Sequence, residues 1–407
     1  MNNTLDCFPD GTPMSAWYHD RRTPDITDLG RQYPITEAGA AGDGTPQTRI
    51  IQGLIDRAAG EGGGVIVVPR GTYVTGALFF RPGVNLCVME GGCLKGSDDI
   101  SDYPPMKTRI EGETCDYFPA LINADRCNGF TLCGEGTIDG NGLRSWKAFW
   151  LRRKWNPSCT NKDEQRARLI YISESENVTI SGLRLQNSQF WTCHFYRCRY
   201  VKVTGCSIFS PFEPVKAPST DAVDLDVCSD VVIRNCDMHV NDDAVALKGG
   251  KGLKADKLPE NGPNERILVE DCHYGFCHAC LTLGSEAVHV KNVILRRITV
   301  DSGFHMLWLK MRPDTPQRYE HILCEDISGR VENAFCLLPW TQFCDLKGGE
   351  PAKSYASHIR VRRCRLECGV VYETRRSDAE YRLEDICFDE SLISAAQRGE
   401  AFWESEP

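Results

Sequence analysis

The sequence predicts an all-β protein, a right-handed parallel β-helix that a short helix caps near the N-terminus. Three observations support this fold class. A unit of alternating hydrophobic residues recurs eight times over residues 178–386, and a period of two residues is typical of strands. Equivalent positions of successive units lie 22 to 37 residues apart, as expected for stacked coils joined by turns of different length. Long stretches with helical periodicity are almost absent. A β-propeller fits less well, because it needs four strands per unit and a longer, more regular period.

We expect residues 1–34 to form an N-terminal extension and residues 35–407 to form one solenoid domain. Within the domain, residues 48–59 predict a helix. Its apolar face holds Ile50, Leu54 and Ala58, and a glycine-rich stretch follows and ends it. Such a helix would close the open end of the solenoid, as terminal repeats require.

The segment 140–164 interrupts the repeat. It is either a long loop or a wall of a binding cleft, because it combines aromatic and basic residues: Trp146, Trp150, Arg152, Arg153, Lys154 and Trp155.

Two columns of inward-facing residues organise the coils. The repeated unit aligns Ile180, Val203, Ile233, Val269, Leu295, Cys324, Val361 and Leu383. The segments just before these units align Ile172, Phe195, Leu225, Leu247, Leu283 and Leu309. Both columns alternate with polar positions, so each coil is predicted to turn one face of its strands inward.

Cysteine is unusually frequent, with 21 residues. Many fall into register: Cys206, Cys236, Cys272 and Cys364 in one column, and Cys127, Cys198 and Cys228 in another. We expect reduced thiols that pack as small apolar groups. The alternative is a zinc site at Cys277 and Cys280 with Cys272 nearby, but no second pair stands at metal-ligand spacing. The sequence therefore predicts no metal and no cofactor.

Charge and hydropathy exclude several classes of partner. The formal net charge of −9 argues against a nucleic-acid-binding protein, and no apolar stretch is long enough to cross a membrane. Residues 1–20 have neither a basic start nor an apolar core, so we expect no signal peptide and a cytoplasmic location. The oligomeric state stays open.

Several carboxylates fall on the outward-facing side of two successive coils. Asp221 lies on one predicted strand together with Asp224 and Asp226, and the next predicted strand begins with Asp242 and Asp243. Since Asp221 and Asp243 are 22 residues apart, they should lie on neighbouring coils, within roughly 5–10 Å of each other. Like charges this close raise one another's pKa and supply a proton donor near neutral pH. Further polar and aromatic residues fall on the same strip: Trp191, His194, Lys248, His278, Trp308 and Lys310. An acidic turn, a calcium site or a solvated surface is the alternative.

With these residues the chain resembles the pectin-degrading polygalacturonases of glycoside hydrolase family 28 over nearly all of residues 35–390. The opening helix with the first coil and the segment 134–142 match the first family landmarks. The motifs then follow in family order: Ser219-Thr220-Asp221 for Asn-Thr-Asp, Asp242-Asp243 for the paired acids, Cys277-His278-Ala279 for Gly-His-Gly, and Trp308-Leu309-Lys310 for Arg-Ile-Lys. The stretch Leu283-Gly284-Ser285-Glu286 resembles the bacterial exo-acting members.

The resemblance implies that Asp242 is the general acid and that Asp221 and Asp243 activate the attacking water. It further implies that His278 tunes the protonation of the acid and that Lys310 binds the substrate. The family inverts configuration, which requires acids far enough apart to admit a water. Trp191, His194, Glu286 and Trp308 are the other expected substrate-binding residues.

The sequence departs from the family at the substrate clamp, where the family arginine is replaced by Trp308. An arginine fork suits a uronate carboxylate, whereas an indole suits the apolar face of a sugar. The acids of the family are all present, so we expect an inverting hydrolase that releases a terminal sugar from anionic pectic oligosaccharides. Galacturonate is the sugar that we expect. A divergent sugar such as that of rhamnogalacturonan is the alternative within the family, and a non-catalytic carbohydrate-binding β-helix is the alternative of another class.

Overall fold

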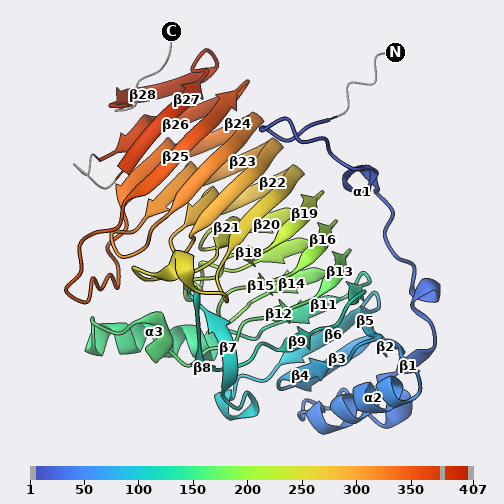
Figure 1. The fold of residues 1–407 in the computed structure, drawn as a ribbon. Coiled ribbons are helices and arrows are strands. Elements are labelled where there is room, and N and C mark those ends of the chain that lie inside the picture. Colours follow the sequence, from blue (N-terminus) through green and yellow to red (C-terminus); the bar gives the residue numbers. More distant parts are fainter. Residues whose placement is uncertain (1–5, 376–380, 402–407) are drawn as a thin grey trace, which may run out of the picture.

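The structure, a computed structural model, describes residues 6–375 and 381–401. Its strands stack into a solenoid with three faces, in which all pairings between coils are parallel (Figure 1). The chain is therefore a right-handed parallel β-helix, as the sequence predicts.

Strands of successive coils pair in register on each face. The first face holds β1 (Gln32–Pro34), β2 (Gly64–Val68), β5 (Val84–Val88), β10 (Thr131–Cys133), β13 (Glu176–Ser181), β16 (Arg199–Thr204) and β19 (Ser229–Arg234). The second holds β3 (Gly71–Thr75), β6 (Gly92–Gly96), β11 (Thr137–Asp139), β14 (Arg184–Gln186), β17 (Ser207–Phe209) and β20 (Asp237–His239). The third holds β4 (Leu78–Phe80), β9 (Ile122–Asp125), β12 (Ile170–Ser173), β15 (Cys193–Tyr196), β18 (Val223–Asp226) and β21 (Val245–Lys248).

The strands of the later coils are longer. They are β22 (Pro263–Gly284), β23 (His289–Met311), β24 (Arg318–Pro339), β25 (Ser354–Arg362), β26 (Arg365–Thr374), β27 (Tyr381–Phe388) and β28 (Ile393–Gly399). The first three of them, β22, β23 and β24, each run along several faces in turn. Short 3₁₀ helices lie in the connections: η1 (Ile26–Leu29), η2 (Ile35–Ala38), η3 (Ile100–Asp102), η4 (Asn161–Asp163) and η5 (Ala255–Lys257).

The predicted inward columns are confirmed, with one exception. The column from Ile172 to Leu309 is fully buried and pairs strand to strand. The column that starts at Ile180 also pairs as predicted as far as Val361. Its last member is wrong, because Val361 pairs with Phe388 and Leu383 pairs with Ala356. The alternation of this coil fits two registers, and the observed one buries Ile386.

The predicted capping helix is present as α2 (Thr48–Gly60), which lies across the first coils (Figure 1). Leu54 and Ala58 are buried, as expected, and they face the core together with Ile51 and Ile55. Ile50 is only half-buried, so the apolar face is centred one residue further along than predicted.

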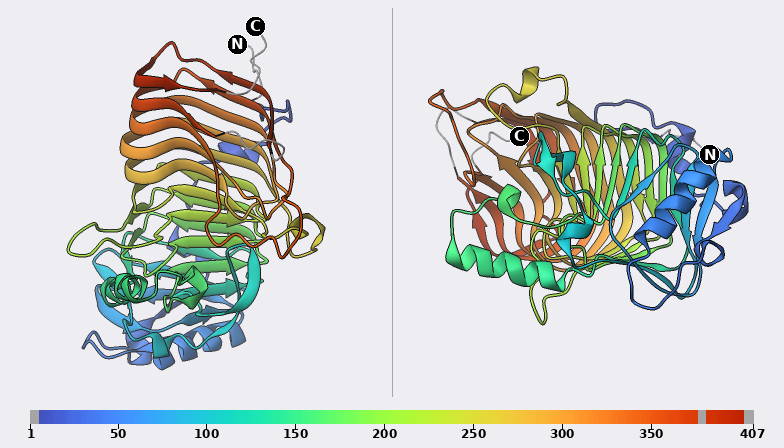
Figure 2. Two further views of the ribbon diagram at one scale, coloured as in Figure 1. Left: turned by 90° about the vertical axis from the view of Figure 1, so that its left-hand side faces the viewer. Right: turned by 90° about the horizontal axis from the view of Figure 1, so that it is seen from below.

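The segment 140–164 is not a plain loop. Most of it forms α3 (Leu143–Trp155), which projects from the side of the solenoid (Figure 2). Trp146 and Phe149, one turn apart, are buried beneath it, whereas Trp150 and Trp155 are exposed. The residues of α3 are mostly good helix formers without a β-branched side chain, a signal that the broken repeat hid.

Residues 6–29 run along the outside of the first face, and we call them the strap (Figure 1). The strap includes α1 (Ala16–His19) and packs apolar side chains against outward-facing residues of β19, β22 and β23: Phe8, Met14 and Tyr18 against Val232, Leu268 and Ile294. The Tyr18 hydroxyl donates a hydrogen bond to Asp230 Oδ1 at 2.9 Å. The solenoid itself begins at β1, slightly earlier than the boundary expected at residue 35. No described helix combines the length and the apolar character that crossing a bilayer would need.

Candidate active site

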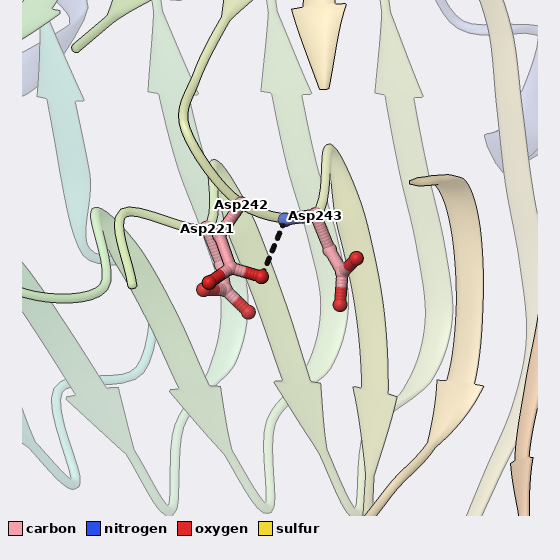
Figure 3. Close-up of side chains that lie close together, drawn as sticks. All are labelled: Asp221, Asp242 and Asp243. Carbon is pink, nitrogen blue, oxygen red and sulfur yellow. Dashed lines mark hydrogen bonds between the residues drawn. The ribbon is translucent and has the colours of Figure 1, made fainter. Parts of the chain in front are cut away.

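Three aspartate carboxylates meet at the third face of the solenoid (Figure 3). Asp221 lies in the turn before β18, and Asp242 and Asp243 lie in the turn before β21. The Ala222 amide donates a hydrogen bond to Asp243 O at 2.9 Å, so Asp221 and Asp243 occupy equivalent positions on neighbouring coils. One oxygen from each of the three carboxylates lies within 4.8 Å of the other two. The acids are therefore slightly closer together than the range expected from the sequence.

The three carboxylates surround one common point. Some point lies no more than about 2.8 Å from all three oxygens, which is the usual length of an O–H···O hydrogen bond. A water molecule at that point would have three acceptors around it.

Two buried lysines balance the negative charge. Lys310 Nζ donates to Asp243 Oδ2 at 2.9 Å. Lys248 Nζ lies 3.2 Å from Asp224 Oδ1 and 3.9 Å from Asp221 Oδ2. Burial raises the pKa of Asp224 to about 7, although Lys248 opposes the rise. The lysines thus hold part of the cluster ionised inside the protein.

His278 is the neighbour of Asp242. Its Nδ1 lies 3.3 Å from Asp242 Oδ1, and its ring stacks on Phe304 with centroids 5.0 Å apart. The His278 amide also donates to the backbone oxygen of Asp242 at 2.8 Å. Backbone pairing between the coils and ring stacking therefore fix the imidazole beside this carboxylate.

The electrostatics separate the two acids. Burial raises the pKa of Asp221 well above its usual range, and the nearby carboxylate of Asp242 adds to the rise. Burial acts on Asp242 in the same direction, but His278 and Lys310 outweigh it and lower the pKa of Asp242 overall. The surroundings therefore shift the two pKa values in opposite directions, that of Asp221 upward and that of Asp242 downward. The resemblance places the general acid at Asp242, so this role stays a prediction.

The acids open into a cavity of about 250 Å³. Eight of the nine expected site residues line it: Trp191, Asp221, Asp242, Asp243, His278, Glu286, Trp308 and Lys310. The sequence therefore predicted the members of this cavity well, although it did not predict their contacts.

His194 is the exception, and its assignment as a substrate-binding residue is wrong. Its side chain is fully buried, and burial lowers the pKa of His194 to about 3. Arg168 Nη1 donates to its Nδ1 at 2.7 Å, and Trp191 packs against the ring. The position does face outward on β15, as the alternation predicts, but other parts of the chain cover it.

Part of that cover is an antiparallel hairpin formed by β7 (Met106–Ile110) and β8 (Glu113–Tyr117). Arg109 of the hairpin donates to Asp226 Oδ2 at 3.0 Å, and both side chains are buried. Arg168, which holds His194, donates to the Arg109 carbonyl at 2.9 Å. The hairpin is thus fastened across the third face by buried charges.

The tip of the hairpin closes one end of the cavity. Glu111 lines the cavity, and a Cβ on Gly112 would lie 2.8 Å from Gly250 C and 2.9 Å from Glu286 Cβ. A second cavity of about 490 Å³ lies elsewhere along the hairpin, lined by Arg109 among others. Residues of the hairpin thus line both cavities. Sequence reasoning missed this element, although Glu111 and Gly112 have positive φ and form the two-residue turn typical of hairpins.

Glu286, at the closed end, is held as a carboxylate. Ser285 Oγ donates to its Oε1 at 2.5 Å, and Arg312 Nη1 lies 3.7 Å from the same oxygen. Burial would raise the pKa of Glu286, but Lys248 and Arg312 lower it overall.

Further residues of the cavity were not predicted as site residues. The segment 140–164 contributes Phe149, Arg153 and Asn161, and the segment after β24 contributes Trp340, Gln342 and Phe343. The first segment thus forms a wall of the cavity, which is one of the two interpretations offered for it. The second segment carries no repeat and no motif, so nothing in the sequence placed it here.

Among the described residues, the three carboxylates form the only group with enough suitably placed donor atoms to hold a metal ion. Lys310 already pairs with Asp243 there, and Lys248 lies beside Asp221. The cysteine columns contribute no such group within the described part of the chain.

Comparison with protein families matches residues 91–310 to the family described as "Glycosyl hydrolases family 28". A probable polygalacturonase of Vitis vinifera is 29% identical over 227 residues, which are 53% of this chain and 44% of that protein. An exopolygalacturonase of Zea mays is 26% identical over 227 residues, or 54% of this chain and 50% of that protein. The chain thus spans about half the length of these plant relatives.

Comparison with solved structures gives a likeness over most of the chain. The hyperthermoactive exopolygalacturonase of Thermotoga maritima superposes with a TM-score of 0.73 over 90% of this chain and 89% of that chain, at 22% identity. At this identity the likeness concerns the fold.

Proposed function

This chain belongs to glycosyl hydrolase family 28, and we propose that it is a hydrolase that releases terminal galacturonate from pectin-derived oligosaccharides. The observation that carries the proposal is the cluster of Asp221, Asp242 and Asp243, whose oxygens lie within 4.8 Å of one another beside a buried lysine. Such a cluster can hold a water molecule and a proton next to a glycosidic bond, which are the two requirements of hydrolysis.

In the proposed reaction, water attacks the anomeric carbon while the bond to the leaving oxygen breaks. A carboxylate of Asp221 or Asp243 takes a proton from the water, and Asp242 gives its proton to the leaving oxygen. Asp242 must therefore be protonated when substrate is bound. The three acids are close enough for a proton on a neighbouring acid to reach Asp242, and an anionic substrate raises the pKa of a nearby carboxyl group.

Inversion of configuration belongs to the proposal through the family resemblance. The spacing of the acids does not support it independently, because inverting enzymes usually separate their carboxyl groups by ~6.5–9.5 Å. The anomer released first, followed by proton NMR before mutarotation, tests this point. Initial release of the anomer opposite to that of the substrate bond supports inversion, and release of the same anomer contradicts it.

Removal of a terminal sugar is supported by the closed end of the cavity. The hairpin tip at Glu111 and Gly112 and the side chain of Glu286 block one direction along the third face. A chain end can enter such a site, whereas the middle of a polymer needs a groove that is open on both sides.

The decisive experiment is digestion of pectic oligosaccharides of defined length and, in parallel, of a long pectic polymer, with products identified by mass and chromatography. Galacturonate released from the start, with little early loss of polymer viscosity, supports the proposal. Mixed oligomers with a rapid loss of viscosity would show an open groove. Binding without release would favour the carbohydrate-binding alternative.

A divergent terminal sugar is the second candidate, and Trp308 favours it. The Lys310 Nζ lies 4.0 Å from the centre of the Trp308 ring, and Trp340 packs edge-on at 5.3 Å. These rings offer an apolar surface where the family places an arginine. Rhamnogalacturonan oligosaccharides therefore belong in the same digestion, and preferential cleavage of them would replace galacturonate in the proposal.

A further inference from the structure

The cavity contains three cationic side chains that a substrate could meet: Arg153, Lys248 and Lys310. Both lysines form ion pairs with the acids. Lys310 donates to Asp243, and Lys248 lies beside Asp224 and Asp221. Trp308 fills the position of the family arginine. Among the cations that line this cavity, the guanidinium of Arg153 is therefore the one that can bind a negatively charged sugar.

Arg153 lies on α3 and is held in a defined orientation. Its Nε donates to Glu164 Oε1 at 3.1 Å and its Nη2 donates to Asn161 Oδ1 at 3.0 Å. The guanidinium carbon lies 4.6 Å from the centre of the Phe149 ring and 5.8 Å from that of Phe343. Both rings line the cavity.

The guanidinium keeps donors for a ligand. Within the described part of the chain, Nη1 of Arg153 has no acceptor, and Nη2 uses one of its two hydrogens on Asn161. The two outer nitrogens can therefore present one hydrogen each to a carboxylate, the bidentate geometry that arginine favours.

Arg153 shares its carboxylate partner with Arg152. Buried Glu164 accepts a hydrogen bond from Arg153 and forms an ion pair with Arg152, whose Nε lies 3.4 Å from its Oε2. The Glu111 carboxylate also lines the cavity and accepts from Asn161, so the free donors of the Arg153 guanidinium, and not an excess of positive charge, provide the recognition. Arg152 itself lines a different cavity and donates to the Asp163 carbonyl.

We propose that Arg153 binds the carboxylate of a uronic acid in the cavity, taking over on an inserted helix the task of the arginine that Trp308 replaces. This inference rests on the proposed function, and it makes the substrate a free uronide rather than a neutral or esterified sugar. Trp308 then covers an apolar face of the same sugar chain.

The test compares charge recognition in four proteins: the wild type, Arg153→Gln, Arg153→Lys and the control Arg152→Gln. Each is assayed on trigalacturonate and on its fully methyl-esterified form, which keeps the same sugars and linkages but carries no charge. Arg152→Gln is a matched control because Arg152 lies on the same helix and forms the other ion pair with Glu164. Thermal unfolding of each variant shows that the fold is kept.

We expect Arg153→Gln to raise KM for the free acid at least ~10-fold with little change in kcat, because ground-state binding is lost. On the ester, Arg153→Gln should match the wild type. Arg153→Lys should restore binding only in part, since an ammonium cannot form the fork. Arg152→Gln should keep the wild-type preference for the acid.

Equal losses on acid and ester, or equal losses in Arg152→Gln and Arg153→Gln, would overturn the role of Arg153. A wild type that cleaves neither form would instead overturn the proposed function, so the two failures are distinguishable.

Discussion

At the scale of single residues, the site depends on how three neighbouring carboxyl groups share charge. Substituting Asp242 by Asn tests the acid directly. The amide cannot donate the proton to the leaving oxygen, so we expect a loss of at least ~10³-fold in kcat with the fold intact. Rates on trigalacturonate and the circular dichroism spectrum measure both effects. Retention of more than about a tenth of wild-type turnover, far above the loss expected for an acid catalyst, would remove Asp242 from this role.

The pH dependence reports which group tunes the acid. A general acid must carry its proton, so activity falls as pH rises through the pKa of the acid. His278 lowers the pKa of Asp242. His278→Gln should therefore raise that pKa and move the alkaline limb of kcat/KM to higher pH. A limb that stays in place, or moves to lower pH, would contradict the assigned role of His278.

The acids do not need a metal ion to neutralise them. Lys310 pairs with Asp243 at 2.9 Å, and Lys248 lies 3.9 Å from Asp221. We expect treatment with a chelator, followed by dialysis, to leave kcat/KM unchanged within error. Loss of activity that a divalent cation restores would show that the three carboxylates serve as ligands.

At the scale of elements, the hairpin β7–β8 decides the shape of the cavity. Gly112 has a positive φ, and an added Cβ would meet Gly250 and Glu286 at under 3.0 Å. Gly112→Ala should therefore destabilise the protein and lower kcat/KM, because the tip must move away from Glu286.

Gly129→Ala is the matched control. Gly129 also has a positive φ, but no atom lies within 4 Å of its added Cβ. The free energy of unfolding of Gly112→Ala should be lower by roughly 1–3 kcal/mol than that of Gly129→Ala, the usual cost of overpacking. Denaturant unfolding measures both variants. Equal losses would show that the tip is not packed as described.

Elements that stay in the stack were predictable, and elements that leave it were not. A coil repeats the same inward pattern as its neighbours, so Ile180 to Val361 could be aligned from the sequence alone. The sequence of the hairpin shows the same alternation of residues as the strands of the coils. Only the two-residue turn at Glu111 and Gly112 distinguishes the hairpin from a coil. His194 was misassigned for this reason, because alternation shows that a residue faces outward but not what lies on top of it.

The site was predictable to the extent that motifs carry it. The three acids lie in the turns just before β18 and β21, and His278 and Lys310 lie on β22 and β23, so the register of the repeat fixes all five. Arg153 and Trp340 reach the cavity from segments without any repeat, so their positions depend on contacts between distant parts of the chain. The pKa of Asp221 is raised and that of Asp242 is lowered because of burial and of residues that lie close in space. A local sequence pattern gives no information on either.

At the scale of the whole molecule, cysteine contributes to the solenoid core. Cys206, Cys236 and Cys272 are buried in one column, and Cys198 and Cys228 in another. Contact with neighbouring thiols and burial raise the pKa of Cys206, Cys228 and Cys272, which disfavours their thiolates, whereas contact with two thiols lowers the pKa of Cys236.

We expect the cysteines to be reduced and to bind no zinc. Thiol titration under denaturant without reductant should detect nearly all 21 thiols, and metal analysis should find no stoichiometric zinc. A majority of unreactive thiols, or bound zinc, would contradict this reading. The result also bears on the cytoplasmic location, which we keep as a proposal, because thiols persist in reducing compartments.

The strap has a consequence for the order in which the molecule assembles. Each coil of a solenoid contacts only its neighbours, so folding can spread along the stack as the chain emerges. The strap cannot join in at that stage. The hydrogen bond from Tyr18 to Asp230 spans 212 residues, and the one from Arg296 to Asp6 spans 290. We therefore expect the strap, which precedes all the coils in the chain, to dock only when β23 is in place and to tie β19, β22 and β23 together late in folding.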